Sequence, residues 1–340
     1  MDQKSIEMSE DKFEAFVVRE KDKGEFTSGI EEMPFSFLPD HEILIKVDFS
    51  SLNYKDGLSA SGNKGVTKNY PHIPGIDAAG EIVADNSGTF QEKEKVIVTG
   101  HDLGSNTPGG YGRYIRVPKD WVVALPDTLS AEQSMVYGTA GFTAMYGVKR
   151  LQRELVNPED GKVLVTGATG GVGSLSVFFL SELGYEVIAA TGKMDRQDFL
   201  KELGASEVIH RDEVTEVGSN FLMSRKWHGA IETVGGSMLD AVIRQTNHDG
   251  AIACCGNILG HKVETSIYPF ILRGVSLLGI DSAICKMPMR LEIWDTIASM
   301  NQQKLPHDFY QKVTLNSLDK EIDTILNGGQ SGRIVVTHKK

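Results

Sequence analysis

Residues 163–173 read Val-Leu-Val-Thr-Gly-Ala-Thr-Gly-Gly-Val-Gly, an apolar run that continues directly into a glycine-rich turn. We predict a buried strand at its start, a helix over 174–183 and a second apolar strand over 185–190. A strand, glycine turn, helix and strand in this order are typical of a dinucleotide-binding unit. The pattern therefore indicates the class of cofactor before anything is known of the substrate.

The glycines of this turn have separate expected roles. Gly170 would let the chain approach a pyrophosphate closely, and Gly173 would let the helix pack tightly on the strand. The free N–H groups and the dipole at the helix N-terminus also favour phosphate. The residues predicted to bind the cofactor here are Ala168, which replaces the usual first glycine, Thr169, Gly170, Gly171, Val172 and Gly173. The alternative is a tight turn in an unrelated α/β protein.

The end of the second strand distinguishes the two nicotinamide cofactors. An NAD site usually has Asp or Glu there to hold the ribose 2′-hydroxyl. This chain instead has Thr191, Gly192 and Lys193, a set that suits a 2′-phosphate, and Arg211 could supply a second cation. We therefore predict NADP(H) as the cofactor. The alternative is that Lys193 is an ordinary solvated lysine.

Composition limits the remaining possibilities. The chain has 340 residues, of which 40% are hydrophobic, and this suits two domains with their own cores. A net charge of −11 disfavours nucleic acid or an anionic membrane as the main partner. No apolar run approaches the roughly 20 residues that span a bilayer, and the acidic segment 1–11 does not resemble a signal peptide. We expect a cytoplasmic protein that acts on a small molecule.

The three cysteines are too few and too poorly spaced for a disulfide framework or a four-cysteine zinc lobe. Cys254 and Cys255 have apolar neighbours, so we expect them in the core.

Short strands with glycine- and proline-rich turns are expected before the cofactor motif. This pattern indicates an antiparallel barrel or sandwich, with strands predicted over 13–19, 42–51, 78–83, 95–98 and 114–118. From Ser130, which with Gln133 has the spacing of a helix capping box, helices alternate with apolar strands. Strands predicted over 163–166, 186–190, 207–209, 229–232, 251–255 and 276–279 would form a doubly wound parallel sheet.

The tail is predicted to contain helices over 290–300 and 318–327 and strands over 313–315 and 333–337. We expect its last strand to return to the N-terminal domain.

Four strings allow a family comparison. They are Ser-Leu-Asn-Tyr-Lys-Asp at 51–56, Pro-Gly-Ile-Asp-Ala-Ala-Gly at 74–80, Gly-Thr-Ala-Gly-Phe-Thr-Ala-Met at 138–145 and Pro-Phe-Ile-Leu-Arg-Gly-Val at 269–275. With the domain order, they resemble the YhdH/YhfP-type quinone oxidoreductases of the medium-chain dehydrogenase/reductase superfamily, a group that includes acrylyl-CoA reductases. The resemblance runs through nearly the whole chain from Lys12 onward.

This resemblance implies an α/β protein with two domains. A β-rich, GroES-like catalytic domain would comprise residues 1–128 and 291–340, and a Rossmann NADP-binding domain would comprise 129–290. It also implies a zinc-free, NADPH-dependent reductase that forms a homodimer.

The residue types agree with the absence of zinc. Zinc-bearing alcohol dehydrogenases have a Gly-His-Glu string where this chain has Gly75, Ile76 and Asp77, and a cysteine ligand in the region of residues 50–53, which here read Ser-Ser-Leu-Asn. Catalytic zinc needs three protein ligands and an open position. His41, His72, His101 and Asp102 lack ligand spacing, so we expect no metal.

A reductase without a metal needs an acceptor that takes hydride readily, such as a quinone, an enone or an α,β-unsaturated thioester. Hydride added to the β-carbon would leave an enolate that needs hydrogen-bond donors and then a proton. Asn53, Tyr54 and Asp56 follow a predicted strand and are the candidate catalytic residues. Tyr54 could donate a proton or bind the nicotinamide ribose, and Asn53 could offer an amide donor.

If the strand continued, Tyr54 and Asp56 would share a face, so that Asp56 could orient Tyr54 or a water molecule. The alternative is that this segment only caps or turns the chain.

Further cofactor contacts are expected from residues on several predicted elements: Thr139, Thr143, Gly256, Asn257, Ser282, Asn327 and Arg333. For Thr139 and Thr143 the alternative is simple helix packing. Two other function classes remain open at this point: methyl transfer with S-adenosylmethionine, and an NADPH-binding redox sensor without turnover.

Overall fold

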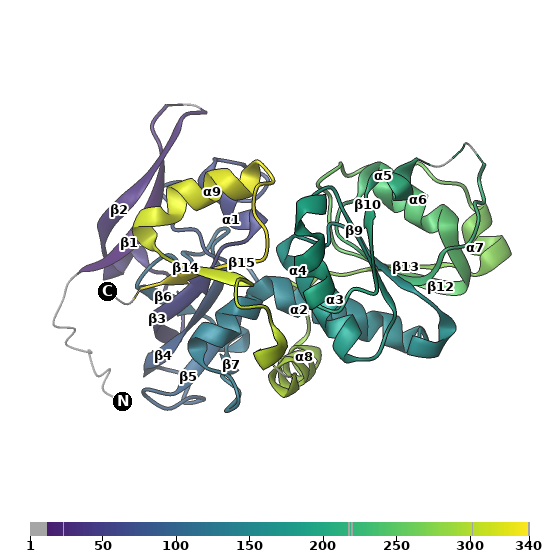
Figure 1. Ribbon diagram of the computed structural model, residues 1–340. Helices are drawn as coiled ribbons and strands as arrows, with labels where there is room; N and C mark the ends of the chain where they lie inside the picture. The colour runs from purple at the N-terminus through teal and green to yellow at the C-terminus, as the bar shows by residue number, and fades with distance from the viewer. Residues whose placement is uncertain (1–11, 23, 217, 219, 301, 339–340) are drawn as a thin grey trace. The chain divides into compact units, whose positions relative to one another are not determined.

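The computed structural model describes residues 12–22, 24–216, 218, 220–300 and 302–338. The acidic segment 1–11 lies outside these residues. The chain divides into two compact units (Figure 1). Unit 1 comprises Met1–Gly138, Gln311–Gly329 and Ile334–Lys340, and unit 2 comprises Thr139–Tyr310 and Gln330–Arg333. By this division residues 291–310 lie in unit 2, whereas the sequence analysis groups them with the N-terminal segment; the boundaries of the functional domains stay a prediction.

Unit 1 is β-rich. A hairpin pairs β1 (Lys12–Glu20) with β2 (Phe26–Pro34). Among the described residues, a further sheet has seven strands in the order β14–β15–β3–β4–β5–β7, with β6 also paired to β3. Their bounds are β3 Ile43–Ser51, β4 Asp77–Asp85, β5 Lys95–Thr99, β6 Tyr114–Val117, β7 Val123–Ala124, β14 Tyr310–Thr314 and β15 Arg333–Thr337.

Strand β15 pairs antiparallel with β3, which confirms the prediction that the last strand returns to the N-terminal part of the chain.

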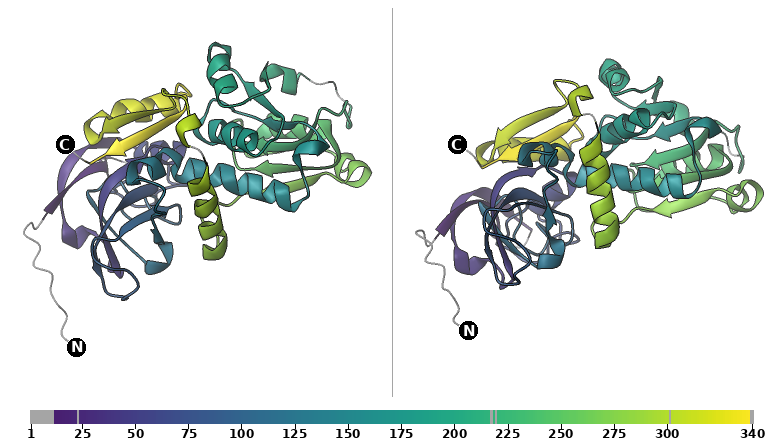
Figure 2. Two further views of the ribbon diagram at one scale, coloured as in Figure 1. Left: turned by 60° about the horizontal axis from the view of Figure 1, so that its bottom comes forward. Right: turned by 90° about the horizontal axis from the view of Figure 1, so that it is seen from below.

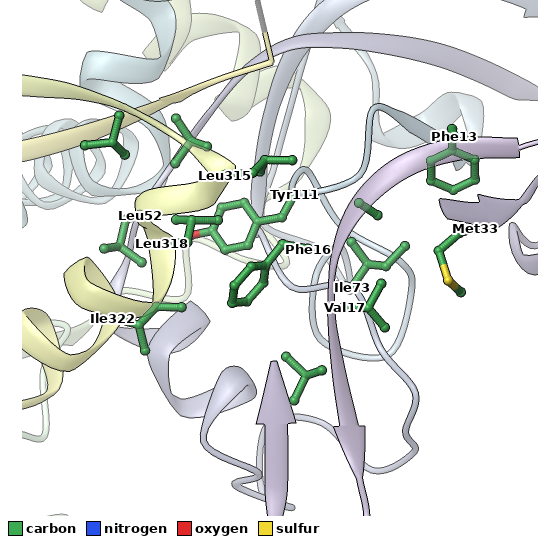
Figure 3. Packing of buried hydrophobic residues seen from close by; sticks show 14 of the residues in the cluster. Phe13, Phe16, Val17, Met33, Leu52, Ile73, Tyr111, Leu315, Leu318 and Ile322 are labelled. Carbon is green, nitrogen blue, oxygen red and sulfur yellow. The ribbon is translucent and has the colours of Figure 1, made fainter. Parts of the chain in front are cut away.

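Successive side chains of β3 point to opposite faces of the sheet, and each face packs into a different hydrophobic core. Ile43, Ile45 and Val47 belong to a core formed with β4, β5 and β6. Leu44 belongs to the other core, in which the ring of Phe16 meets that of Tyr111 edge-on at 6.2 Å (Figure 3).

Unit 1 also contains a pair of helices that pack against each other. Helix α1 (Tyr54–Ala60) lies beside α9 (Leu318–Leu326), as the views of Figures 1 and 2 show. Gly57 permits this approach, since a Cβ there would lie only 3.0 Å from the side chain of Leu326. The packing fixes the position of the α1 N-terminus, where the sequence places Asn53 and Tyr54.

Unit 2 contains the predicted doubly wound sheet. In the part of the chain that the structure describes, six parallel strands follow the order β10–β9–β8–β11–β12–β13. The strand order reverses between β8 and β11, the switch point where such sheets bind ligands. The strands are β8 Val163–Val165, β9 Val187–Thr191, β10 Glu207–His210, β11 Trp227–Glu232, β12 Thr246–Cys254 and β13 Ser276–Gly279.

Helices connect these strands and continue into the tail. They are α2 Ala131–Arg153, α3 Gly171–Glu182, α4 Gln197–Glu202, α5 Asp212–Thr215, α6 Gly236–Gln245, α7 Tyr268–Arg273 and α8 Met287–Ser299. The predicted capping box before α2 is confirmed: Ser130 N–H donates to the Gln133 side chain at 2.9 Å, and Gln133 N–H donates to Ser130 Oγ at 3.1 Å. Helix α2 is interrupted at Gly138, whose φ of 49° and ψ of −152° are not helical.

Two expectations need correction. Cys254 and Cys255 are only partly buried, because they stand at the carboxyl end of β12 where the strand leaves the sheet. Strands β2 and β7 were not predicted from the sequence.

None of the described helices is both long and apolar enough to cross a membrane.

Candidate functional site

The glycine turn of unit 2 joins β8 to α3 in the predicted geometry. Helix α3 begins at Gly171, and Gly170 is its N-cap residue. A Cβ on Gly173 would lie 2.3 Å from the carbonyl oxygen of Gly167, so only glycine allows the helix to pack this closely on the turn. The space beside Gly171 is occupied by the Arg333 guanidinium, 3.0 Å from where a Cβ would be. The free N–H groups of the first helical turn and this cation suit an anionic phosphate.

The end of β9 brings together hydroxyl and cationic groups. The hydroxyls of Thr169 and Thr191 lie 3.3 Å apart, and Thr191 Oγ1 accepts from Lys193 N–H at 3.0 Å. The Lys193 ammonium donates to the Gln330 carbonyl at 2.7 Å, and burial lowers its pKa. Lys193 therefore differs from an ordinary solvated lysine.

Arg211 borders the same strand end. Its side chain lies along Gly192, with Nε 3.2 Å from the position of a Cβ there, and it is 61% exposed. Two cations thus border a residue that has no side chain, and β9 itself ends without a carboxylate.

The carboxyl end of β11 holds a charged residue that the sequence analysis missed. Glu232 is fully buried and accepts hydrogen bonds from Thr166 Oγ1 at 3.1 Å and from the N–H groups of Val234 and Gly235 at 2.9 and 3.0 Å. Burial raises the pKa of Glu232, although the hydrogen bonds that it accepts act in the opposite direction. The available sequence signal was a charged residue at the end of an apolar strand, three positions before the first glycine of the Gly-Gly pair at 235–236.

Other predicted cofactor residues of unit 2 have clear structural partners. Thr143 Oγ1 lies 2.7 Å from both the Thr139 carbonyl and Ser282 Oγ, so the structure brings these three residues together. Gly256 packs so closely that a Cβ would lie 1.8 Å from the Thr233 carbonyl. Asn257 is exposed.

In unit 1, Asn327 follows α9, and its side chain donates to the Asp323 carbonyl at 2.8 Å.

The segment 53–56 is a helix start, and the expectation of a continued strand is wrong. Asn53 is the N-cap of α1, and Asp56 closes a capping box by accepting from Asn53 N–H at 2.8 Å. Asp56 is fully buried, whereas Tyr54 is 38% exposed. The two side chains therefore do not share a face, and Asp56 does not orient Tyr54.

Asp56 is held by a network of donors. Its Oδ1 accepts from the N–H groups of Gly75 at 3.1 Å and Ile76 at 2.8 Å, and its Oδ2 also accepts from Asn53 Nδ2 at 3.2 Å. Asn53 Nδ2 further donates to Asp77 at 2.8 Å, so the amide that we expected to face a substrate is directed at two buried carboxylates.

Asp77, which the sequence analysis did not select, is fully buried and also accepts from Ser51 Oγ. Burial, and then the charge of Asp77, raise the pKa of Asp56 to about 7. Two carboxylates that share one amide donor thus form a network that can hold a proton near neutral pH.

The scattered histidines form no ligand set. The His101 ring stacks on Trp121 at 5.1 Å between centroids, and the buried His72 meets the edge of Tyr70. Within the described ranges, no group of three or more His, Cys, Asp or Glu residues could hold a metal ion. The expectation of a metal-free site stays a prediction.

Comparisons with known proteins cover both units. The alcohol dehydrogenase GroES-like domain family matches residues 39–127, and the zinc-binding dehydrogenase family matches residues 171–291. The putative quinone oxidoreductase YhfP of Bacillus subtilis is 42% identical over 93% of this chain and 96% of its own length. The probable acrylyl-CoA reductase AcuI of Escherichia coli is 39% identical over 93% of this chain and 97% of its own.

Solved structures agree with these matches. The YhdH oxidoreductase from Salmonella enterica, in complex with NADP, superposes with a TM-score of 0.91 at 39% identity and covers 96% of this chain and 100% of its own. The structure of Bacillus subtilis YhfP, which has NAD bound, gives a TM-score of 0.91 at 41% identity and covers 96% of this chain and 99% of its own.

Proposed function

This chain belongs to the medium-chain dehydrogenase/reductase superfamily and to its YhdH/YhfP group, and on that premise we propose that it uses NADPH to reduce a conjugated acceptor without zinc. The acceptor classes that we propose are quinones and α,β-unsaturated acyl-CoA thioesters such as acrylyl-CoA. Both activities occur in the names of its relatives. Membership of this oxidoreductase family also removes the support for methyl transfer.

The observation that carries the choice of NADPH is the end of β9. Relatives of similar identity have been crystallised with NADP and with NAD, so this chain's own residues must decide. Lys193 and Arg211 border Gly192, and no carboxylate stands at the strand end to hold a 2′-hydroxyl. A carboxylate there would repel a 2′-phosphate, whereas an ammonium and a guanidinium attract it. The glycine turn and the Arg333 guanidinium fit the pyrophosphate of the same cofactor.

The proposed class of acceptor follows from the residue types, which lack the zinc ligands of the zinc-bearing relatives. Without zinc to polarise a carbonyl, the acceptor must be conjugated so that it takes hydride readily. Ile76, an apolar residue, stands where the zinc-bearing relatives have histidine. When bound, the nicotinamide would supply hydride to the β-carbon of the acceptor. The protein must then stabilise negative charge on an oxygen and deliver a proton.

Tyr54 is the donor that we propose from unit 1. It is exposed at the first turn of α1, directly after the buried cap formed by Asn53 and Asp56. We assign Tyr54 either the proton or the hydrogen bond to the nicotinamide ribose. Asn53 and Asp56 are then positioning residues that fix the start of α1.

The experiment that tests this function follows NADPH oxidation with acrylyl-CoA beside a small quinone. We expect turnover with at least one of them, and a strong preference for the thioester would establish acyl-CoA reduction. NADPH binding without consumption across both acceptor classes would contradict the proposal and indicate a redox sensor.

We also propose that the protein is a homodimer of the cytoplasm. Strand β13 ends the described parallel sheet, and the apolar side chains of Ile271, Leu272 and Leu277 around it are 64%, 55% and 43% exposed. An end strand with exposed apolar neighbours is a favourable surface for pairing with a second copy. Light scattering should give twice the chain mass, and Leu277→Lys should lower it; a monomeric wild-type protein would exclude the dimer.

A further inference from the structure

A short stretch of the tail belongs to unit 2 although its neighbours in the chain do not. Gln330–Arg333 lies in unit 2, between Gln311–Gly329 and Ile334–Lys340 of unit 1. We name residues 330–332 the clip. Gly332 N–H donates to the Thr169 carbonyl at 3.1 Å, and the Gln330 carbonyl accepts from Lys193 Nζ at 2.7 Å. The clip is thus bonded both to the phosphate turn and to the lysine that follows β9.

Two polar atoms of the clip lack partners. Gln330 Oε1 and Ser331 Oγ are buried and make no hydrogen bond to the residues that the structure describes. The amide of Gln330 has a fixed sense, because Nε2 donates to the Gly332 carbonyl at 3.3 Å. Buried polar groups are normally satisfied, so a hydroxyl and an acceptor without partners on adjacent residues indicate a ligand that supplies both kinds of partner.

The clip also restricts Lys193. A lysine side chain has four rotatable bonds and loses much of its freedom when its ammonium is held. One of the three ammonium donors is used by the Gln330 carbonyl. The others can serve an anion beside Gly192 without release of the clip.

We propose that the clip binds the phosphorylated adenosine ribose and positions Lys193 to recognise its 2′-phosphate. Ser331 donates to a phosphate oxygen, and Gln330 Oε1 accepts from the ribose 3′-hydroxyl. A phosphorylated ribose carries both an anionic acceptor and a hydroxyl donor, and these match the two unpartnered atoms. This inference rests on the proposed use of NADPH.

Binding of 2′,5′-ADP, which carries the 2′-phosphorylated adenosine half of NADPH without the nicotinamide half, tests the contact residues. Calorimetry should show that Ser331→Ala and Gln330→Ala each weaken its binding about fivefold or more. Ser299→Ala, at an exposed helix end, is the matched control and should bind as the wild type does. Wild-type affinity in both clip variants would overturn the clip as a binding element. Failure of the wild-type protein to bind NADPH would instead overturn the proposed function.

A pair of glycine variants tests the positioning of Lys193. Gly332 and Gly328 have φ of +66° and +70°, so alanine strains the backbone at both. Only at Gly332 would the new Cβ meet another atom, the Phe309 carbonyl oxygen, at 2.2 Å, whereas Gly328 has open space. Gly332→Ala should lower the preference for NADPH over NADH about tenfold, and Gly328→Ala should not.

The same substitution in a Lys193→Ala background gives a readout that general damage to the fold would not produce. Without the ammonium, Gly332→Ala should change the NADPH to NADH ratio no further. An equal loss of affinity for both cofactors in Gly332→Ala would overturn the positioning role. If Gly332→Ala does not fold, the NADPH to NADH ratio of Ser331→Ala decides, because only the phosphate contact distinguishes the two cofactors, and a ratio equal to that of the wild type overturns the inference.

Discussion

The Asp56 carboxylate accepts a hydrogen bond from the backbone N–H of Ile76 at 2.8 Å and thereby joins the start of α1 to the loop that leads into β4. The same carboxylate caps α1 through Asn53. Tyr54, two residues earlier, is exposed. Asp56 thus has a structural role and Tyr54 is free to contact a ligand, and substitutions at the two positions can distinguish these roles.

Removal of the Tyr54 hydroxyl should affect turnover and leave stability intact. If Tyr54 supplies the proton, Tyr54→Phe should lower kcat for an enoyl thioester by about 10²-fold, the lower range for general acid catalysis. If it binds the nicotinamide ribose, KM for NADPH should rise while kcat changes little. Steady-state kinetics distinguish the two roles, and unchanged kinetics with an intact fold would remove Tyr54 from the mechanism.

Asp56→Asn should be strongly destabilising. The amide nitrogen of the new side chain would face N–H donors that now meet a carboxylate oxygen, which leaves buried groups unpaired. We expect a loss of about 2–4 kcal/mol in the free energy of unfolding, measured by urea denaturation. Asp127→Asn, an exposed residue of the same unit, is the control. A loss no greater than that of the control would show that the network does not support the fold.

The cost of Asp56→Asn should also depend on pH. The pKa of Asp56 is raised from 3.8 to about 7 in the folded protein, so the folded state binds the proton more tightly than the unfolded state. Stability from this group is fully present below about pH 4 and is lost as the pH rises through 7. The variant cannot titrate there, so its deficit should be larger at pH 5 than at pH 8 by about 2–3 kcal/mol. An equal deficit at both values would refute the shift.

Lys193→Ala should weaken NADPH binding far more than NADH binding. A charge-assisted hydrogen bond to a phosphate contributes about 1.5–3 kcal/mol, which corresponds to roughly 10- to 100-fold in Kd. Fluorescence titration with both cofactors measures the effect, with the exposed Lys201→Ala as the control. Equal losses for NADPH and NADH would show that Lys193 does not read the 2′-phosphate.

Treatment with a metal chelator should leave NADPH oxidation unchanged. The described residues offer no group of three metal-binding side chains, and Ile76 has no ligand atom. Activity is measured before and after dialysis against a chelator. Loss of activity that added zinc restores would be incompatible with the proposed metal-free reduction.

Local patterns predicted most of the fold. The apolar strands of the parallel sheet, the glycine turn and the capping box at Ser130 are encoded by neighbouring residues, and the structure confirms them. Strand β2 was missed because most of its residues are at least partly exposed and lack a clear apolar alternation. Strand β7 has only two residues.

The candidate site was less predictable because its charged residues depend on distant partners. Asp77 meets Asn53 from 24 positions away, and Glu232 meets Thr166 from 66 positions away, so no local pattern identifies either. The sequence analysis expects a strand exit at Tyr54, but a helix begins there, and Asn53 and Asp56 have the spacing of its capping box. Weak local propensity in a seven-residue helix is here outweighed by its packing on α9.

The pairing of β15 with β3 has a consequence for biosynthesis. All six described strands of the parallel sheet have been translated once residue 279 is added, whereas β3 lacks this neighbour until residues 333–337 have been translated. The nascent chain must therefore keep the β15-facing side of β3 free from mispairing during most of elongation. Chaperone demand should consequently concentrate on the segment that is made first.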